Sequence, residues 1–173
     1  MLLQKWKNYP EQTKLNLLKN DNYFQFVMKK IAIVKIITLL SILLFVYTGI
    51  AKLMDYSLFR DQVAMSPILQ PFAGVIIWAL PLAEFFTAIL LIIPRWRLYG
   101  FYAACGLMLI FTVYLLGMIT LNRRLPCSCG GIIELLSWKQ HVLINCFLIF
   151  LEFMGIRLQK KINLEAQFSS KSY

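Results

Sequence analysis

Long apolar segments, each of about 20 residues, divide this sequence and limit what it can fold into. A helix rises 1.5 Å per residue, so such a segment is long enough to cross a hydrocarbon core of about 30 Å. The composition agrees, because 60% of the residues are hydrophobic and only 15% are charged. We therefore expect an all-α, polytopic membrane protein whose surroundings are a lipid bilayer.

Four transmembrane helices, packed as a bundle, are predicted. The expected spans are residues 31–54, 72–94, 98–121 and 138–156. The third span contains no charged residue, whereas Lys139, His141 and Glu152 interrupt the fourth. Lys35 and Lys52 lie near the two ends of the first span, from where their long side chains can reach the membrane interface.

The segments outside these spans are short and basic. Residues 1–30 predict a basic segment at the membrane surface or, as an alternative, a loosely ordered cytoplasmic tail. Residues 55–71 contain prolines and predict an interfacial loop or a short re-entrant helix. Residues 157–173 form a basic tail, so that 31–156 is the predicted membrane domain.

The net charge of +10 indicates topology and not nucleic-acid binding, because the Lys and Arg residues flank the apolar segments. The first apolar segment also lacks the small-residue pattern of a cleaved signal peptide. Cations near span ends are retained on the cytoplasmic side, and most of them lie in the two tails and between the second and third spans. This distribution predicts that both termini are cytoplasmic and that the loop before the fourth span faces outward.

That outer loop contains two closely spaced cysteines in a setting that could make them reactive. Cys127 and Cys129 follow Pro126, precede two glycines, and lie shortly after Arg123 and Arg124. Nearby cations favour the thiolate, which attacks disulfides and binds metals, and an outer location is oxidising. A disulfide between residues two apart would be strained and easily reduced. Redox exchange, a structural disulfide, unpaired surface thiols and metal capture all fit this pattern.

Two further residues are candidates for proton or cofactor chemistry. His141, about one turn into the fourth span, could protonate a leaving thiolate or a quinone oxygen, or could be an interfacial histidine without chemistry. With Cys127 and Cys129 it could also bind copper or zinc. Glu84, near the middle of the second span, could bind a quinone or relay protons, or could hold a polar group such as Thr48, Tyr47 or Thr112.

The remaining cysteines and the glycines within the spans are interpreted structurally. Cys105 and Cys146 lie at different depths in the third and fourth spans, so we expect two buried, inert thiols and no mutual disulfide. We expect the glycines to permit close helix packing. They are Gly49, Gly74, Gly100, Gly106 and Gly117.

Three motifs together resemble the bacterial DoxX-like membrane proteins and, within them, the methylamine-utilisation MauE group. The motifs are YTGIAKL at 47–53, PLAE at 81–84 and PCSCGG at 126–131, the last followed by Trp138 and His141. The resemblance covers roughly residues 31–156. It implies a four-helix bacterial inner-membrane protein whose Cys-x-Cys pair works with a periplasmic thioredoxin-like protein, in support of methylamine dehydrogenase maturation.

The fold that this resemblance implies is also similar to the quinone-linked bundles of DsbB and vitamin K epoxide reductase. Unlike those proteins, this sequence has no Cys-x-x-Cys motif and no second outer pair of thiols. The leading hypothesis is therefore extracytoplasmic thiol–disulfide exchange through Cys127 and Cys129. A non-enzymatic assembly subunit and a metal-handling protein are the alternatives.

Overall fold

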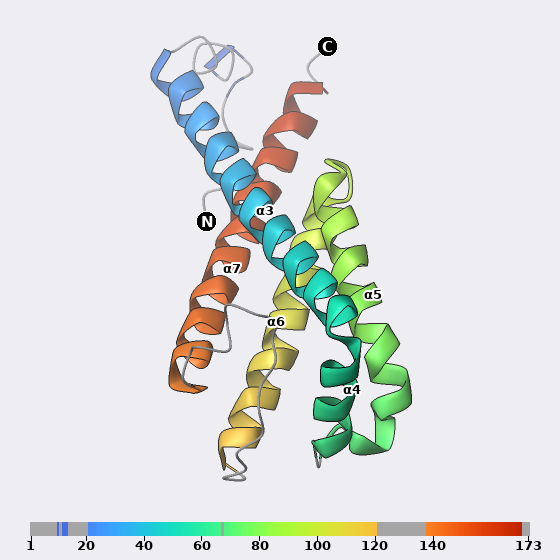
Figure 1. Cartoon of the computed structure of the whole chain (residues 1–173). Coiled ribbons are helices and arrows are strands. Elements are labelled where there is room, and N and C mark those ends of the chain that lie inside the picture. Colours follow the sequence, from blue (N-terminus) through green and yellow to red (C-terminus); the bar gives the residue numbers. More distant parts are fainter. Residues whose placement is uncertain (1–9, 11, 14–20, 67, 121–137, 171–173) are drawn as a thin grey trace.

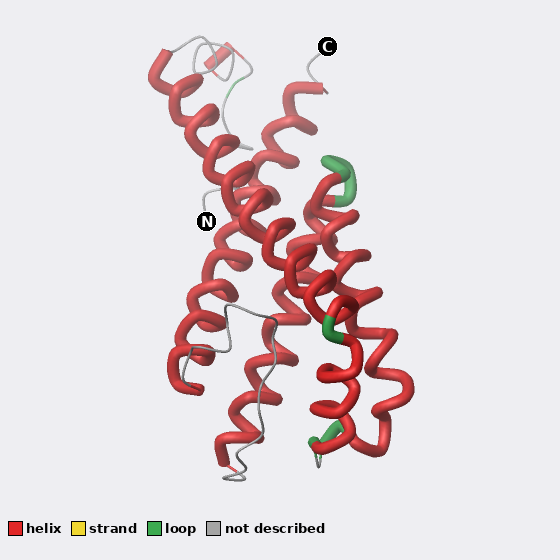
Figure 2. The backbone as a smooth tube through the Cα atoms, viewed as in Figure 1, coloured by secondary structure: helices red, strands yellow, loops and turns green. Residues whose placement is uncertain are grey.

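The computed structural model describes residues 10, 12–13, 21–66, 68–120 and 138–170. The elements are α3 (Asp21–Met54), α4 (Tyr56–Met65), η1 (Gln70–Phe72), α5 (Ala73–Ile92), α6 (Arg97–Thr120) and α7 (Trp138–Ser170). Helices make up all of this regular structure, with no strand among the described residues (Figure 2). Four of them, α3, α5, α6 and α7, are long and apolar enough to cross a membrane, which confirms the predicted fold class.

The four long helices form a closed bundle in which each packs against two others (Figure 1). Helix α3 contacts α5 and α7, and α6 contacts the same two helices from the other side. Only a short turn joins α5 to α6, so these two helices form an antiparallel hairpin. Phe45, Leu91 and Phe101 are fully buried in the centre, while large apolar side chains such as Trp78 and Phe86 face outward, where lipid would cover them.

The first and last membrane helices extend beyond the predicted spans. Helix α3 already begins at Asp21, and α7 continues through the basic tail to Ser170. The extensions lie at the same end of the bundle, where Lys30 of α3 donates a hydrogen bond to Glu165 of α7 at 2.9 Å. Hydropathy marks only the apolar part of a helix, so it could not indicate that polar pairing would stabilise helix beyond the bilayer core.

The connection between α3 and α5 contains a short helix with one buried face. Helix α4 buries Phe59 and Val63 against α5, whereas Arg60 and Asp61 are exposed. The helix lies at the end of the bundle opposite to the extensions of α3 and α7 (Figure 1). Beyond it, the buried Ser66 side chain accepts a hydrogen bond from the Tyr114 hydroxyl of α6 at 3.2 Å, which ties the connection to the bundle.

Glycines matter where helices approach most closely. A Cβ atom on Gly100 would lie 2.8 Å from the backbone nitrogen of Leu91, so the α5–α6 hairpin needs glycine at this position. Gly49 similarly lies against the Phe85 ring. Gly106 has open space around it, so the packing role predicted for every glycine holds for only some of them.

Candidate functional site

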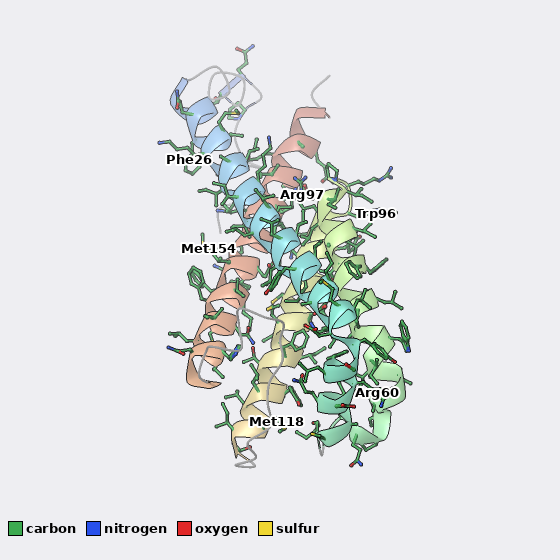
Figure 3. All side chains as sticks on the ribbon, in the orientation of Figure 1. Phe26, Arg60, Trp96, Arg97, Met118 and Met154 are labelled. Carbon is green, nitrogen blue, oxygen red and sulfur yellow. The ribbon has the colours of Figure 1, made fainter. Side chains whose placement is uncertain are left out.

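The residues predicted to carry thiol chemistry lie in one loop outside the described part of the chain. They are Cys127, Cys129, Arg123 and Arg124. The helix ends that flank this loop, at Thr120 of α6 and Trp138 of α7, lie at the same end of the bundle as α4 (Figure 1). Figure 3 labels Arg60 and Met118 toward this end and Trp96 and Arg97 at the opposite end.

His141 is the only predicted site residue near this loop whose side chain is described. It lies one turn into α7, at the end of the bundle where the cysteine loop begins and ends. Its side chain is buried, although it is close to the beginning of the helix. An imidazole held on the inner face of α7 could exchange protons with the loop or with a group inside the bundle. Its catalytic role stays a prediction.

Glu84 forms a buried ion pair with Lys52. Lys52 Nζ donates to Glu84 Oε1 at 2.7 Å, and the two side chains are 6% and 1% exposed. The ammonium group also donates to the backbone oxygen of Thr48 at 3.3 Å. Burial of either charge alone would cost several kcal/mol, whereas the pair is neutral as a whole. The interpretation of Lys52 as a lysine that reaches the interface was therefore wrong, because a countercharge on α5 holds it inside.

Other helices complete the surroundings of this pair. The Lys52 ammonium lies 5.7 Å from the centroid of the Phe111 ring of α6, and the Thr48 hydroxyl lies beside the Glu84 carboxylate. Thr112, a predicted partner of Glu84, instead donates to the Met108 backbone oxygen at 2.8 Å. The arrangement favours a structural role for Glu84, which joins α5 to α3. Quinone binding by this residue stays a prediction.

A second buried carboxyl group was not among the predicted site residues. Glu152 of α7 is 2% exposed, and its Oε1 lies 2.5 Å from the Ser41 hydroxyl of α3. From the sequence, Glu152 was interpreted only as a charge that interrupts the fourth predicted span. Its partner Ser41 lies near the middle of the first predicted span, residues 31–54, so this carboxyl lies well inside the bundle. The signal that could have revealed it is an ionisable residue within a predicted span, the same signal that identified Glu84.

The two cysteines within the spans are free thiols, as predicted. Cys105 of α6 is partly buried and lies close enough to Glu152 for an electrostatic interaction. Cys146 of α7 is exposed on the outside of the bundle, so the predicted burial of this thiol was wrong. Cys105 is therefore part of the surroundings of a buried acid, and Cys146 is a natural control for it.

No group of three His, Cys, Asp or Glu side chains within the described helices could hold a metal ion. The predicted copper or zinc site consists of His141 and two loop cysteines that lie outside them. Metal binding at the loop therefore stays a prediction.

The fold and the buried pairs define a multi-pass membrane protein, a four-helix bundle whose helices are joined by polar contacts inside the membrane. The chain belongs to a family described as "Methylamine utilisation protein MauE", whose model matches residues 29–158. Membership links the protein to methylamine utilisation. Comparisons with curated proteins and with solved structures found no match.

Proposed function

We propose that this protein exchanges disulfides through Cys127 and Cys129 with a periplasmic thioredoxin-like protein. The observation that carries the proposal is the PCSCGG segment at 126–131, which the chain places between two membrane helices of a MauE-family bundle. Proline and glycine favour a tight turn, and the arginines just before it favour thiolate. Such a loop presents a reactive pair at the membrane surface while the bundle anchors it.

The distribution of cations supports an outward-facing loop. The end of the bundle that contains the α5–α6 turn carries Arg95, Arg157, Lys160 and Lys161 among the described residues. Fewer basic side chains are described at the opposite end, and the exposed Arg60 is one of them. Cytoplasmic retention of cations would then place both termini inside and the cysteine loop in the periplasm of a bacterial inner membrane.

The chemistry is a two-electron exchange without a net change in protons. A thiolate of the partner attacks the Cys127–Cys129 disulfide, forms a mixed disulfide and releases one loop thiolate. The second partner thiolate then attacks the mixed disulfide and releases the other loop thiolate. The partner dithiol is oxidised to a disulfide and the loop disulfide is reduced to a dithiol, and the reverse steps run the reaction in the other direction. His141 would supply or accept the proton of a leaving thiol.

The family suggests the purpose of this exchange. A protein linked to methylamine utilisation would support the maturation of a periplasmic, methylamine dehydrogenase-like protein, whose disulfides must be formed or corrected. The partner would carry electrons between that protein and the loop. The membrane protein would thus stand at the end of a disulfide relay.

The first test is the redox state of the loop in native membranes, measured by thiol alkylation and mass shift before and after a mild reductant. We expect Cys127 and Cys129 to cycle between disulfide and dithiol. In the single variants Cys127→Ser and Cys129→Ser, the remaining thiol should trap a mixed disulfide with a thioredoxin-like protein. Cys105→Ser and Cys146→Ser are matched controls, since they remove a thiol from the same chain and should leave trapping unchanged.

Other outcomes would overturn the proposal in distinct ways. A loop that resists strong reductant would indicate a structural disulfide, and unaltered function in the double Cys→Ser variant would indicate an assembly subunit. A loop that stays reduced and holds stoichiometric copper or zinc, lost in His141→Ala, would indicate metal handling.

A further inference from the structure

The contact between Ser41 and Glu152 determines where a hydrogen atom must lie. The Ser41 oxygen is 2.8 Å from the backbone oxygen of Ile37 and 2.5 Å from Glu152 Oε1. A serine hydroxyl has one hydrogen, and a backbone carbonyl can only accept. If Ser41 donates to Ile37, as buried serines in membrane helices commonly do, its hydrogen is not available for Glu152. The Ser41 oxygen takes part in two separate two-centre hydrogen bonds only when the Glu152 carboxyl group donates its own proton to Ser41.

The charges around Glu152 lead to the same conclusion. Ser41 contacts it from α3, Cys105 of α6 lies within electrostatic range, and α6 has no charged residue after Arg97. The nearest basic residue along α7, Arg157, is exposed and lies over the Phe153 ring. No ion pair to Glu152 occurs in the described part of the chain. An isolated carboxylate in this interior would cost several kcal/mol, and a bound proton removes that charge.

Glu84 provides the contrast within the same molecule. Its carboxylate is equally buried, but Lys52 lies 2.7 Å away and supplies a positive charge. Glu152 has no cation in that position and has a hydroxyl group instead. The bundle therefore neutralises one buried acid with an ammonium group and the other with a proton.

We propose that Glu152, Ser41 and Cys105 form a proton-binding site in the membrane interior, and that the bound proton holds α3 against α7. Loss of the proton would leave a carboxylate with no countercharge among the described residues, and the Ser41 hydroxyl would have to release Ile37 to donate to it. The α3–α7 contact would then weaken or admit water. This inference rests on the buried contacts of the described helices and is independent of the cysteine loop.

Infrared spectroscopy of the purified full-length protein, in a detergent without ester groups, tests the site directly. We expect the carbonyl band of a protonated carboxyl group at neutral pH, lost in Glu152→Gln and retained in the matched variant Glu84→Gln. Glutamine is nearly isosteric with the neutral acid and can still donate to Ser41, so the bundle should tolerate it. Absence of the band from the wild-type protein, or its persistence in Glu152→Gln, would overturn the proposal.

A second variant keeps the test decisive if Glu152→Gln does not fold. Ser41→Ala removes the acceptor of the carboxyl proton, so the carbonyl band should shift to higher frequency. The Cys105 S–H band, assigned by its loss in Cys105→Ser and not in Cys146→Ser, should shift when alkaline pH removes the Glu152 proton. A carbonyl band that does not shift in Ser41→Ala, or an S–H band whose frequency does not change with pH, would contradict the assigned site.

Discussion

Replacement of Lys52 by methionine should lower the free energy of unfolding by about 3–5 kcal/mol, because it leaves the Glu84 carboxylate buried without a countercharge. The structure indicates why the effect is large. At the observed 2.7 Å and an effective dielectric constant of about 20, Coulomb's law gives an attraction of roughly 6 kcal/mol. Desolvation of the two ions offsets much of this attraction in the intact pair. A single substitution removes the attraction and retains the desolvation cost of the remaining ion.

A double-mutant cycle separates this coupling from the loss of packing. Glu84→Gln should also destabilise the protein, whereas the double variant Lys52→Met/Glu84→Gln should lose less than the sum of the single losses. The measurement is the free energy of reversible unfolding in mixed micelles. Arg60 and Asp61 provide the matched control, because Arg60 Nε and Asp61 Oδ1 are 3.6 Å apart on the exposed face of α4. Neutralisation of that pair should change stability by no more than about 0.5 kcal/mol.

Additive losses would refute this reasoning. If the double variant Lys52→Met/Glu84→Gln loses as much as the two single variants together, within about 0.5 kcal/mol, the two charges do not stabilise each other. Equal effects of the α4 control pair and the buried pair would likewise contradict the assignment of Lys52 to the interior.

Two further predictions concern packing and the α3–α5 connection. Gly100→Ala should destabilise the protein by about 1–3 kcal/mol in the same unfolding assay, since the new methyl group would meet the Leu91 backbone. Gly106→Ala should be neutral or slightly stabilising, because Gly106 has open space around it. Ser66→Ala should cost about 1 kcal/mol, because the Tyr114 hydroxyl loses a buried acceptor. Equal effects of the two glycine substitutions, or no effect of Ser66→Ala, would contradict these contacts.

The number of membrane helices and their hairpin connection could be predicted from the sequence. Segment length relative to bilayer thickness is a strong constraint, and the few residues between Ile92 and Arg97 leave room only for an antiparallel turn. The ends of the helices were harder to predict. Hydropathy falls where Lys30 and Glu165 begin to pair, although the helices themselves continue past that point.

The partners of the buried charges could not be predicted, because they depend on which helices are neighbours. Lys52 was interpreted as an interfacial residue and Glu152 as an interruption of the fourth span, yet both are inside the bundle. A signal was present in the spacing of α3. Lys30, Ser41 and Lys52 follow one another at intervals of eleven residues, close to three helical turns, so they lie on one face of the helix. That spacing identifies a polar stripe, but it does not reveal which helix faces it.

This stripe explains how α3 is fixed between its two neighbours. Lys30 and Lys52, at the two ends of the stripe, pair through their ammonium groups with Glu165 of α7 and Glu84 of α5, respectively. The two lysines lie about 33 Å apart along the helix at 1.5 Å per residue. In both ion pairs a lysine ammonium group lies beside the glutamate carboxylate and neutralises it. The middle contact, Ser41 with Glu152, has no permanent cation, so its neutrality depends on one exchangeable proton. The two ion pairs therefore set the register of α3, and the central contact is the one place along this stripe where protonation can change how tightly α3 packs against α7.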